Sequence, residues 1–181
     1  MLGNERVFMN VPSVIFKTRE NDYGPEGQCF LGNWKPIQSD NFFANKKIVL
    51  VSIPGAFTPT CTSTHIPGYE SNYEKLRLYV DEVYCISVND AFVMNAWGKQ
   101  EGIEKVKLLP DGEGNFTKGM GMLVSKPMQG FGKRSWRYSA YIENGLVVKM
   151  FVEAGLNNES NDDDPFEVSD AVTMLSYLAS K

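Results

Sequence analysis

Apolar and polar residues follow one another along the chain in periods that predict alternating strands and helices. Residues 46–53 end in the run Ile-Val-Leu-Val-Ser-Ile, which predicts a central strand buried on both faces. The next apolar and aromatic residues recur at steps of three and four, as on the buried face of a helix; they are Ile66, Tyr69, Tyr73, Leu76 and Val80. This helix is expected to begin near Cys61 and to bend around Pro67.

The same alternation continues through the middle of the chain. Residues 82–89 predict a second buried strand, and residues 90–102 predict a helix for which Asn89 is the expected N-cap. Residues 106–112 then predict a strand and a turn. Two strand-helix units in succession indicate parallel strands joined by crossover connections.

The last third of the chain has a different pattern. Residues 137–153 contain two alternating runs joined by Asn144-Gly145, a pair that favours a two-residue hairpin turn. Residues 169–179 then predict a closing helix. Its expected apolar face consists of Ala171, Val172, Leu175 and Leu178.

Together these elements predict an α/β fold with a central mixed β-sheet flanked by helices. The first strands are expected to be parallel and the hairpin to form an antiparallel edge. This order is typical of a thioredoxin-like fold with an N-terminal extension. The chain has 181 residues, 43% of them hydrophobic, so we expect residues 1–181 to form a single domain.

Composition and charge argue against two classes of partner. The net charge is −4, and no basic cluster exceeds a pair such as Lys133-Arg134, so no nucleic-acid partner is expected. The longest apolar run is far shorter than the ~20 residues of a membrane helix, so no membrane partner is expected. Glu5 and Arg6 occupy the region where a signal peptide would be apolar, which indicates a cytoplasmic protein. The acidic run at residues 157–165 lacks the spacing of a calcium loop and is interpreted as a solvated loop.

Chemistry centres on one of three cysteines. Cys29, Cys61 and Cys85 cannot all pair within one chain, and a reducing compartment would keep them as thiols. Cys61 ends the segment Pro-Gly-Ala-Phe-Thr-Pro-Thr-Cys, where the chain passes from the central strand into a helix. The free amide groups and the positive dipole end of a helix stabilise a thiolate. Thr58 can place its hydroxyl beside this sulfur, and the prolines of the segment stiffen its approach. The alternative is an inert, buried cysteine.

Several thiol chemistries do not fit the spacing around Cys61. The following residues are Thr-Ser-Thr, so the second thiol of a dithiol exchange motif is missing. A cysteine protease needs a histidine base from elsewhere in the fold. The one histidine, His65, lies one turn along the same helix and is interpreted as a structural hydrogen-bonding residue. Cys61 and His65 supply two of the four ligands that zinc requires. A lone thiolate that attacks a small electrophile remains, with no metal or cofactor.

The segment around Cys61 also carries a specific resemblance. Pro54, Thr58 and Cys61 match the peroxiredoxin pattern Pro-x-x-x-Thr-x-x-Cys, and the longer segment PGAFTPTCTSTHIPGY resembles the type II peroxiredoxins. Further similar segments are ISVNDAFVMNAW, PDGEGNFTKGMGMLV, GFGKRSWRYS and DPFEVSDAVTMLSYLA. The resemblance covers roughly residues 5–180 and is strongest to bacterial members, some of which are fused to a glutaredoxin domain.

The resemblance implies a mechanism and site residues. The Cys61 thiolate would attack a hydroperoxide and become a sulfenic acid. Thr58 would accept a hydrogen bond from the peroxide, and Pro54 would limit access of water. The family's arginine corresponds to Arg137, which would hold the thiolate and polarise the O–O bond. Arg134, three residues earlier, is the competing candidate.

The resemblance also implies how the enzyme is reset. Glutathione and glutaredoxin are the expected reductants in a one-cysteine cycle, with thioredoxin less favoured. Cys85 is expected to be buried, and Cys29 has no counterpart that can be assigned. Two alternatives stay open: a two-cysteine peroxidase resolved by Cys85, and a non-catalytic redox sensor or interaction module. A homodimer is implied, built in part from aromatics such as Phe131.

Overall fold

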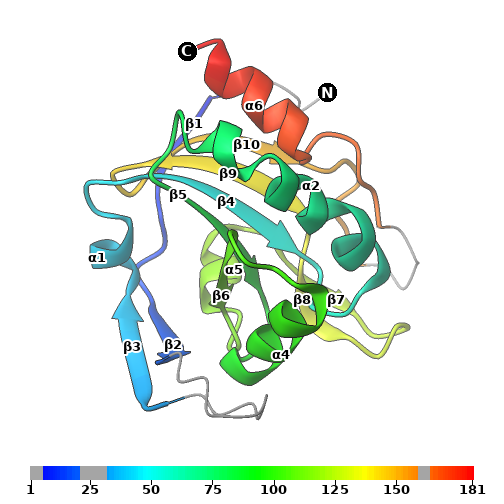
Figure 1. Ribbon diagram of the computed structural model, residues 1–181. Coiled ribbons are helices and arrows are strands. Elements are labelled where there is room, and N and C mark those ends of the chain that lie inside the picture. The colour runs from blue at the N-terminus through cyan, green and yellow to red at the C-terminus, as the bar shows by residue number, and fades with distance from the viewer. Residues whose placement is uncertain (1–5, 21–31, 159–163) are drawn as a thin grey trace.

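A computed structural model describes residues 6–20, 32–158 and 164–181 (Figure 1). Its main sheet has six strands, which are β1 (Arg6–Asn10), β4 (Lys47–Ile53), β5 (Glu82–Ser87), β6 (Lys107–Pro110), β9 (Tyr138–Glu143) and β10 (Leu146–Val152). Their order across the sheet is β1-β10-β9-β4-β5-β6. Strands β4, β5 and β6 are parallel, and β9, β10 and β1 continue the sheet with antiparallel pairs. The predicted α/β class with a central mixed sheet is therefore confirmed.

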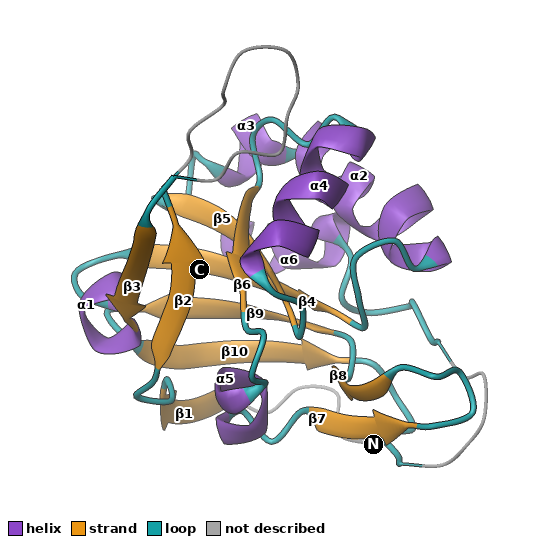
Figure 2. Ribbon diagram, turned by 90° about the horizontal axis from the view of Figure 1, so that it is seen from below, coloured by secondary structure: helices purple, strands orange, loops and turns teal. Residues whose placement is uncertain are grey.

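The remaining elements surround this sheet (Figure 2). Two small antiparallel pairs are formed by β2 (Ile15–Arg19) with β3 (Trp34–Gln38), and by β7 (Leu123–Lys126) with β8 (Gly132–Ser135). The helical elements are α1 (Ser39–Phe43), the π-helical turn η2 (Cys61–His65), α2 (Ile66–Ser71), α3 (Tyr73–Leu76), α4 (Ala91–Glu101), α5 (Asn115–Gly119) and α6 (Ala171–Ala179).

Strand β4 separates two hydrophobic cores. Val49, Val51 and Ile53 point to the core shared with η2, α2, α3, α4 and α6. Ile48 and Leu50 point to the other core, which contains side chains of α1, α5 and β2. All five side chains are fully buried. Burial on both faces explains the nearly continuous apolar run and confirms the predicted central strand.

The N-terminal segment completes the sheet on its antiparallel side. The predicted hairpin is present, with Asn144 and Gly145 at φ 49° and 75°, the left-handed backbone that this two-residue turn requires. It is not the outermost pair, however, because β1 pairs with β10 and forms the edge. The pairs β2–β3 and β7–β8 and the short helices α1 and α5 were not predicted. Elements of four or five residues carry too few periods to stand out from their surroundings.

Two details of the predicted helices are wrong. The N-cap of α4 is Asp90, whose carboxylate accepts hydrogen bonds from the amides of Phe92 and Val93. Asn89 lies one residue too early to cap, and its side chain bonds elsewhere. On α6, Val172 points to solvent with 63% of its surface exposed, and Met174 takes its place in the core.

No helix of the described ranges is both long enough and apolar enough to cross a lipid bilayer.

The corrected face of α6 can be tested by stability. Met174 has no exposed surface, so Met174→Ala leaves a cavity and should lower the free energy of unfolding by about 2–5 kcal/mol. Val172→Ala, two residues earlier, should change it by less than about 0.5 kcal/mol. Urea denaturation of the two variants measures both values. Equal losses would contradict this orientation of α6.

Candidate active site

Cys61 lies in the first turn of the helix that follows β4. The helical stretch begins at residues 59 and 60, and its first hydrogen bond joins the Thr62 amide to the Thr58 carbonyl at 3.1 Å. The Cys61 carbonyl accepts from the amide of Ile66, five residues later, which makes this turn a π-helix. The helix therefore starts where the sequence predicted, and it widens into a π-helical turn just before Pro67.

The loop between β4 and this helix is held from two sides. The Asn89 amide oxygen accepts from the backbone N–H of Ala56 at 3.0 Å and from the Ser87 hydroxyl at 2.7 Å. Thr58 donates its hydroxyl hydrogen to the Gly55 carbonyl at 2.7 Å. This bond fixes the position of the Thr58 oxygen and uses only its hydrogen. Both lone pairs of the oxygen therefore remain available to accept a hydrogen bond.

Arg137 brings its guanidinium directly to the cysteine. Its Nη1 atom donates to the Cys61 sulfur at 3.4 Å, and the two side chains are 1% and 0% exposed. Arg137 lies between β8 and β9, whereas Cys61 lies in the helical turn that follows β4. The contact therefore joins the antiparallel part of the sheet to the helix that follows a parallel strand. Burial alone lowers the pKa of Arg137, but the charges of Cys61 and Asp164 outweigh it and raise that pKa. The guanidinium is therefore a permanent cation beside the sulfur.

The same guanidinium has two more partners. Nη1 also lies 2.9 Å from Nδ1 of His65, and Nη2 forms a salt bridge with the carboxylate of Asp164. The other ring nitrogen of His65, Nε2, lies 3.1 Å from the Ser169 carbonyl. Arg137 can only donate and a carbonyl can only accept, so these contacts require a neutral ring with its hydrogen on Nε2. Burial, followed by the charge of Arg137, lowers the pKa of His65 to about 4.

Glu153 fixes the turn that carries Ser169. Its buried carboxylate accepts hydrogen bonds from the amides of Glu167, Val168 and Ser169 and from the Ser169 hydroxyl, at 2.7–3.0 Å. These bonds outweigh the effect of burial and lower the pKa of Glu153. The Ser169 carbonyl is thus held where His65 and the hydroxyl of Tyr69 both bind it.

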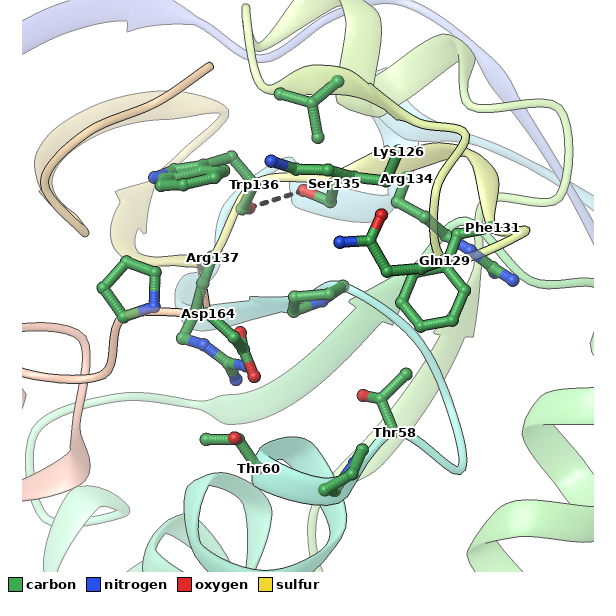
Figure 3. A pocket seen from close by; sticks show the side chains of 14 residues that line it. Thr58, Thr60, Lys126, Gln129, Phe131, Arg134, Ser135, Trp136, Arg137 and Asp164 are labelled. Carbon is green, nitrogen blue, oxygen red and sulfur yellow. Dashed lines mark hydrogen bonds and ion pairs between the residues drawn. The ribbon is translucent and has the colours of Figure 1, made fainter. Parts of the chain in front are cut away.

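A cavity of about 350 Å³ opens beside this group (Figure 3). Its lining consists of Pro54, Thr58, Pro59, Thr60, Val124, Lys126, Gln129, Phe131, Arg134, Ser135, Trp136, Arg137, Asp164 and Pro165. Figure 3 shows Thr58 and Thr60 on the side opposite Trp136 and Lys126, with Arg137 and Asp164 close together. The buried Cys61 is not among the described residues that line the cavity, but Arg137, which contacts its sulfur, is one of them.

The structure places the sequence-predicted residues as follows. Cys61 and Arg137 are in contact, and Thr58 and Pro54 line the adjoining cavity. Arg134, the competing arginine, instead donates to the Val88 carbonyl at 2.9 Å and lies over the ring of Phe131.

Of the other two cysteines, Cys85 is not among the described residues that line the cavity. Cys85 is fully buried in β5, and this burial, with a smaller effect of Cys61, raises the pKa of its thiol. Cys29 lies outside the described residues. Within the described ranges, no group of three or more His, Cys, Asp or Glu side chains is placed to hold a metal ion.

The acidic run at residues 157–165 does more than the sequence indicated. Its described residues form a loop in which Asn158 and Asp164 are exposed, as expected. Asp164 nevertheless pairs with Arg137, and Asn157 and Asn158 accept hydrogen bonds from Lys126 and from the Ser125 amide. Residues 159–163 of this run lie outside the described residues. A run of acids has no periodicity, so nothing in it distinguishes Asp164 from its neighbours. The contribution of Glu153 was missed as well, because a single carboxylate at the end of a predicted strand carries no signal of its own.

Comparison with known proteins places this site in a family. The sequence profile of the Redoxin family matches residues 19–175. A peroxiredoxin of Synechocystis is 54% identical over 169 residues, covering 93% of this chain and 88% of the relative. This chain belongs to the peroxiredoxin family. Like its relatives, this peroxiredoxin is a thiol peroxidase.

Two further comparisons refine the position of this peroxiredoxin. A hybrid peroxiredoxin of Haemophilus influenzae is 49% identical over 93% of this chain, which spans 64% of that longer protein. The crystal structure of a Plasmodium falciparum antioxidant protein, a 1-Cys peroxiredoxin, superposes with a TM-score of 0.84 at 34% identity and covers 96% of this chain and 99% of its own. The type II assignment and the thioredoxin-like fold agree with these relatives.

The buried neutral histidine predicts how stability depends on pH. His65 has a pKa of about 4 in the fold and about 6.5 when unfolded, so between these values the unfolded chain binds a proton that the folded protein does not. Stability from this group is complete above pH 6.5 and is lost as pH falls towards 4. The loss amounts to roughly 3 kcal/mol.

Urea denaturation between pH 7 and pH 4 measures this loss. The His65→Asn variant has no imidazole and should have a flatter profile over that range than the wild type. Parallel profiles for the two proteins would contradict a neutral, buried His65.

Proposed function

We propose that this chain reduces hydrogen peroxide and alkyl hydroperoxides through a sulfenic acid at Cys61, and that glutathione and glutaredoxin restore the thiol in a one-cysteine cycle. The contact between Arg137 Nη1 and the Cys61 sulfur at 3.4 Å, beneath a cavity, is the observation that carries the proposal. A cation with almost no exposed surface attracts negative charge on the sulfur strongly, because the surroundings screen the interaction poorly.

The first step is a displacement at oxygen. The thiolate attacks the terminal oxygen of the hydroperoxide, an S–O bond forms, and the O–O bond breaks. The departing alkoxide or hydroxide takes a proton from water and leaves as alcohol or water, so Cys61 becomes a sulfenic acid. Negative charge moves from sulfur to the leaving oxygen in this step. A fixed cation that spans both positions stabilises the transition state more than the reactants.

Two features of the site support this path. Nε of Arg137 is buried and has no hydrogen-bond partner within the described ranges, so a donor is available for a peroxide oxygen. Thr58 donates its hydroxyl hydrogen to the Gly55 carbonyl, so its oxygen remains available to accept a hydrogen bond from the peroxide. We therefore propose that Thr58 orients the peroxide substrate. Pro54, at the cavity lining beside it, limits the access of water to the intermediate.

The second half of the cycle returns the sulfur to a thiol. Glutathione condenses with the sulfenic acid, which forms a mixed disulfide and releases water. A second thiol, from glutaredoxin or glutathione, then attacks the glutathione sulfur and frees Cys61. Burial of Cys85 and the raised pKa of its thiol disfavour it as a resolving nucleophile. The similarity to a 1-Cys peroxiredoxin also supports a one-cysteine cycle.

We further propose a cytoplasmic homodimer. The exposed ring of Phe57, with 48% of its surface accessible, and the side chain of Phe131 lie at the loops that surround the cavity. Large apolar side chains at such loops suit a contact with a second copy of the chain.

The role of Thr58 predicts a difference between two conservative variants. Thr58→Val removes the acceptor and should lower the second-order rate constant for hydrogen peroxide roughly tenfold or more, since it deletes one hydrogen bond to the reacting group. Thr58→Ser keeps the hydroxyl and should stay within about threefold of the wild type. Stopped-flow fluorescence measures both rates. Equal rates for Val and Ser variants would remove Thr58 from the mechanism.

The reductant is tested by steady-state turnover. With glutathione and glutaredoxin, the wild type and the Cys85→Ser and Cys29→Ser variants should consume peroxide at similar rates, and Cys61→Ser should consume none. Consumption limited to one equivalent of peroxide would indicate a sensor rather than an enzyme. A contrary result would be turnover that thioredoxin alone sustains in the wild type but not in Cys85→Ser or Cys29→Ser. That result would replace the one-cysteine cycle with a two-cysteine cycle.

A further inference from the structure

His65 contacts the Arg137 guanidinium without lining the cavity. It is 1% exposed and does not line the cavity, so within the described ranges it has no direct path to a substrate. Its Nδ1 nevertheless lies 2.9 Å from Nη1 of Arg137, the same nitrogen that donates to the Cys61 sulfur at 3.4 Å. A guanidinium nitrogen carries two hydrogens, and here one faces each acceptor.

We propose that His65 is a positioning residue of this peroxidase, whose neutral Nδ1 atom holds the Arg137 guanidinium against the Cys61 sulfur. The inference rests on the proposed role of Arg137. The proposed role belongs to the Nδ1 atom and not to the bulk of the ring. It therefore differs from a purely structural role of His65 in packing the helix.

The ring can perform this task because its other nitrogen is fixed. Nε2 donates to the Ser169 carbonyl at 3.1 Å, and the Glu153 carboxylate holds the Ser169 amide and hydroxyl at 2.8 and 2.7 Å. The π-helical turn places Cys61 and His65 on the same side of the helix, both towards Arg137. A chain of hydrogen bonds therefore runs from Glu153, the residue after β10, through the turn before α6 to the reactive sulfur.

The second partner of Arg137 is the more exposed one. Asp164 binds Nη2, and 35% of its side chain is exposed, so solvent partly screens this salt bridge. His65 is fully buried, so solvent does not compete for its hydrogen bond with the nitrogen that contacts the sulfur. The groups that face the ring are Arg137, Asp164 and Glu153 among the charged ones and Tyr69 and Phe166 among the aromatic ones.

Two amide variants separate the nitrogen from the ring. In His65→Asn the amide oxygen can occupy the place of Nδ1 and accept from Arg137, but it cannot reach Ser169. In His65→Gln the longer amide can donate to Ser169 in place of Nε2, and the acceptor at Nδ1 is lost. Both remove the ring, so their effects on packing are comparable.

The measurements are the second-order rate constant with hydrogen peroxide and the pH profile of Cys61 alkylation by iodoacetamide. We expect His65→Gln to lose about tenfold or more in the peroxide rate and to shift the alkylation profile to higher pH. His65→Asn should stay within about threefold of the wild type in both. Equal losses in the two variants with an unshifted alkylation profile would overturn the proposal and leave His65 a packing residue.

Arg137→Met distinguishes failure of this inference from failure of the proposed function. If Arg137→Met reacts like the wild type, the arginine has no part in the chemistry and the proposed function fails with it. If Arg137→Met loses activity and His65→Gln does not, the inference alone is wrong.

A further measurement needs no substitution of His65 itself. The chain has a single histidine, so its imidazole signals in a long-range ¹H–¹⁵N spectrum belong to His65. We expect a protonated Nε2 and an unprotonated Nδ1 whose resonance moves in Arg137→Met, where its donor is gone. A hydrogen on Nδ1, or a resonance unaffected by the loss of Arg137, would contradict the proposal.

Discussion

A buried guanidinium organises this protein. Removing Arg137 from water is costly unless its donors meet acceptors, and the fold supplies them from three places. The sulfur of Cys61 comes from the first turn after β4, His65 from the same helix, and Asp164 from the segment before α6. Each of these segments is held to the sheet by contacts of its own. The cost of burying the charge is offset only when all of them are in place, which ties the reactive geometry to the completed fold.

The sheet topology explains how such distant residues meet. Strand β9 lies antiparallel to β4, so the start of β9 is adjacent to the carboxyl end of β4. Arg137 precedes β9 and Cys61 follows β4, which brings them to the same edge of the sheet although 76 residues separate them. The end of β10 reaches this edge as well, and there Glu153 holds the turn before α6. Hydrogen bonding in the antiparallel half thus sets the geometry of a helix in the parallel half.

Much of this arrangement could be predicted from sequence because its parts carry periodic or local signals. The buried run of β4, the hairpin at Asn144 and the Pro-Thr-Cys segment each have a pattern that only a few structures satisfy. Asp164 and Glu153 carry no such pattern. The sequence around a single acidic residue in a loop is the same whether its carboxylate is solvated or buried. Asn89 shows a further limit. Both a cap and a loop contact suit an asparagine there, and only the three-dimensional path of residues 54–58 decides between them.

The complete burial of the Cys61 sulfur has a consequence for the catalytic cycle. A thiol larger than a peroxide would have to bring its sulfur into line with Cys61, which has no exposed surface in this conformation. The proposed reduction by glutathione would therefore require a conformation in which Cys61 is exposed. The wide π-helical turn at Cys61–His65 begins at this residue, and unwinding it would part the sulfur from Arg137.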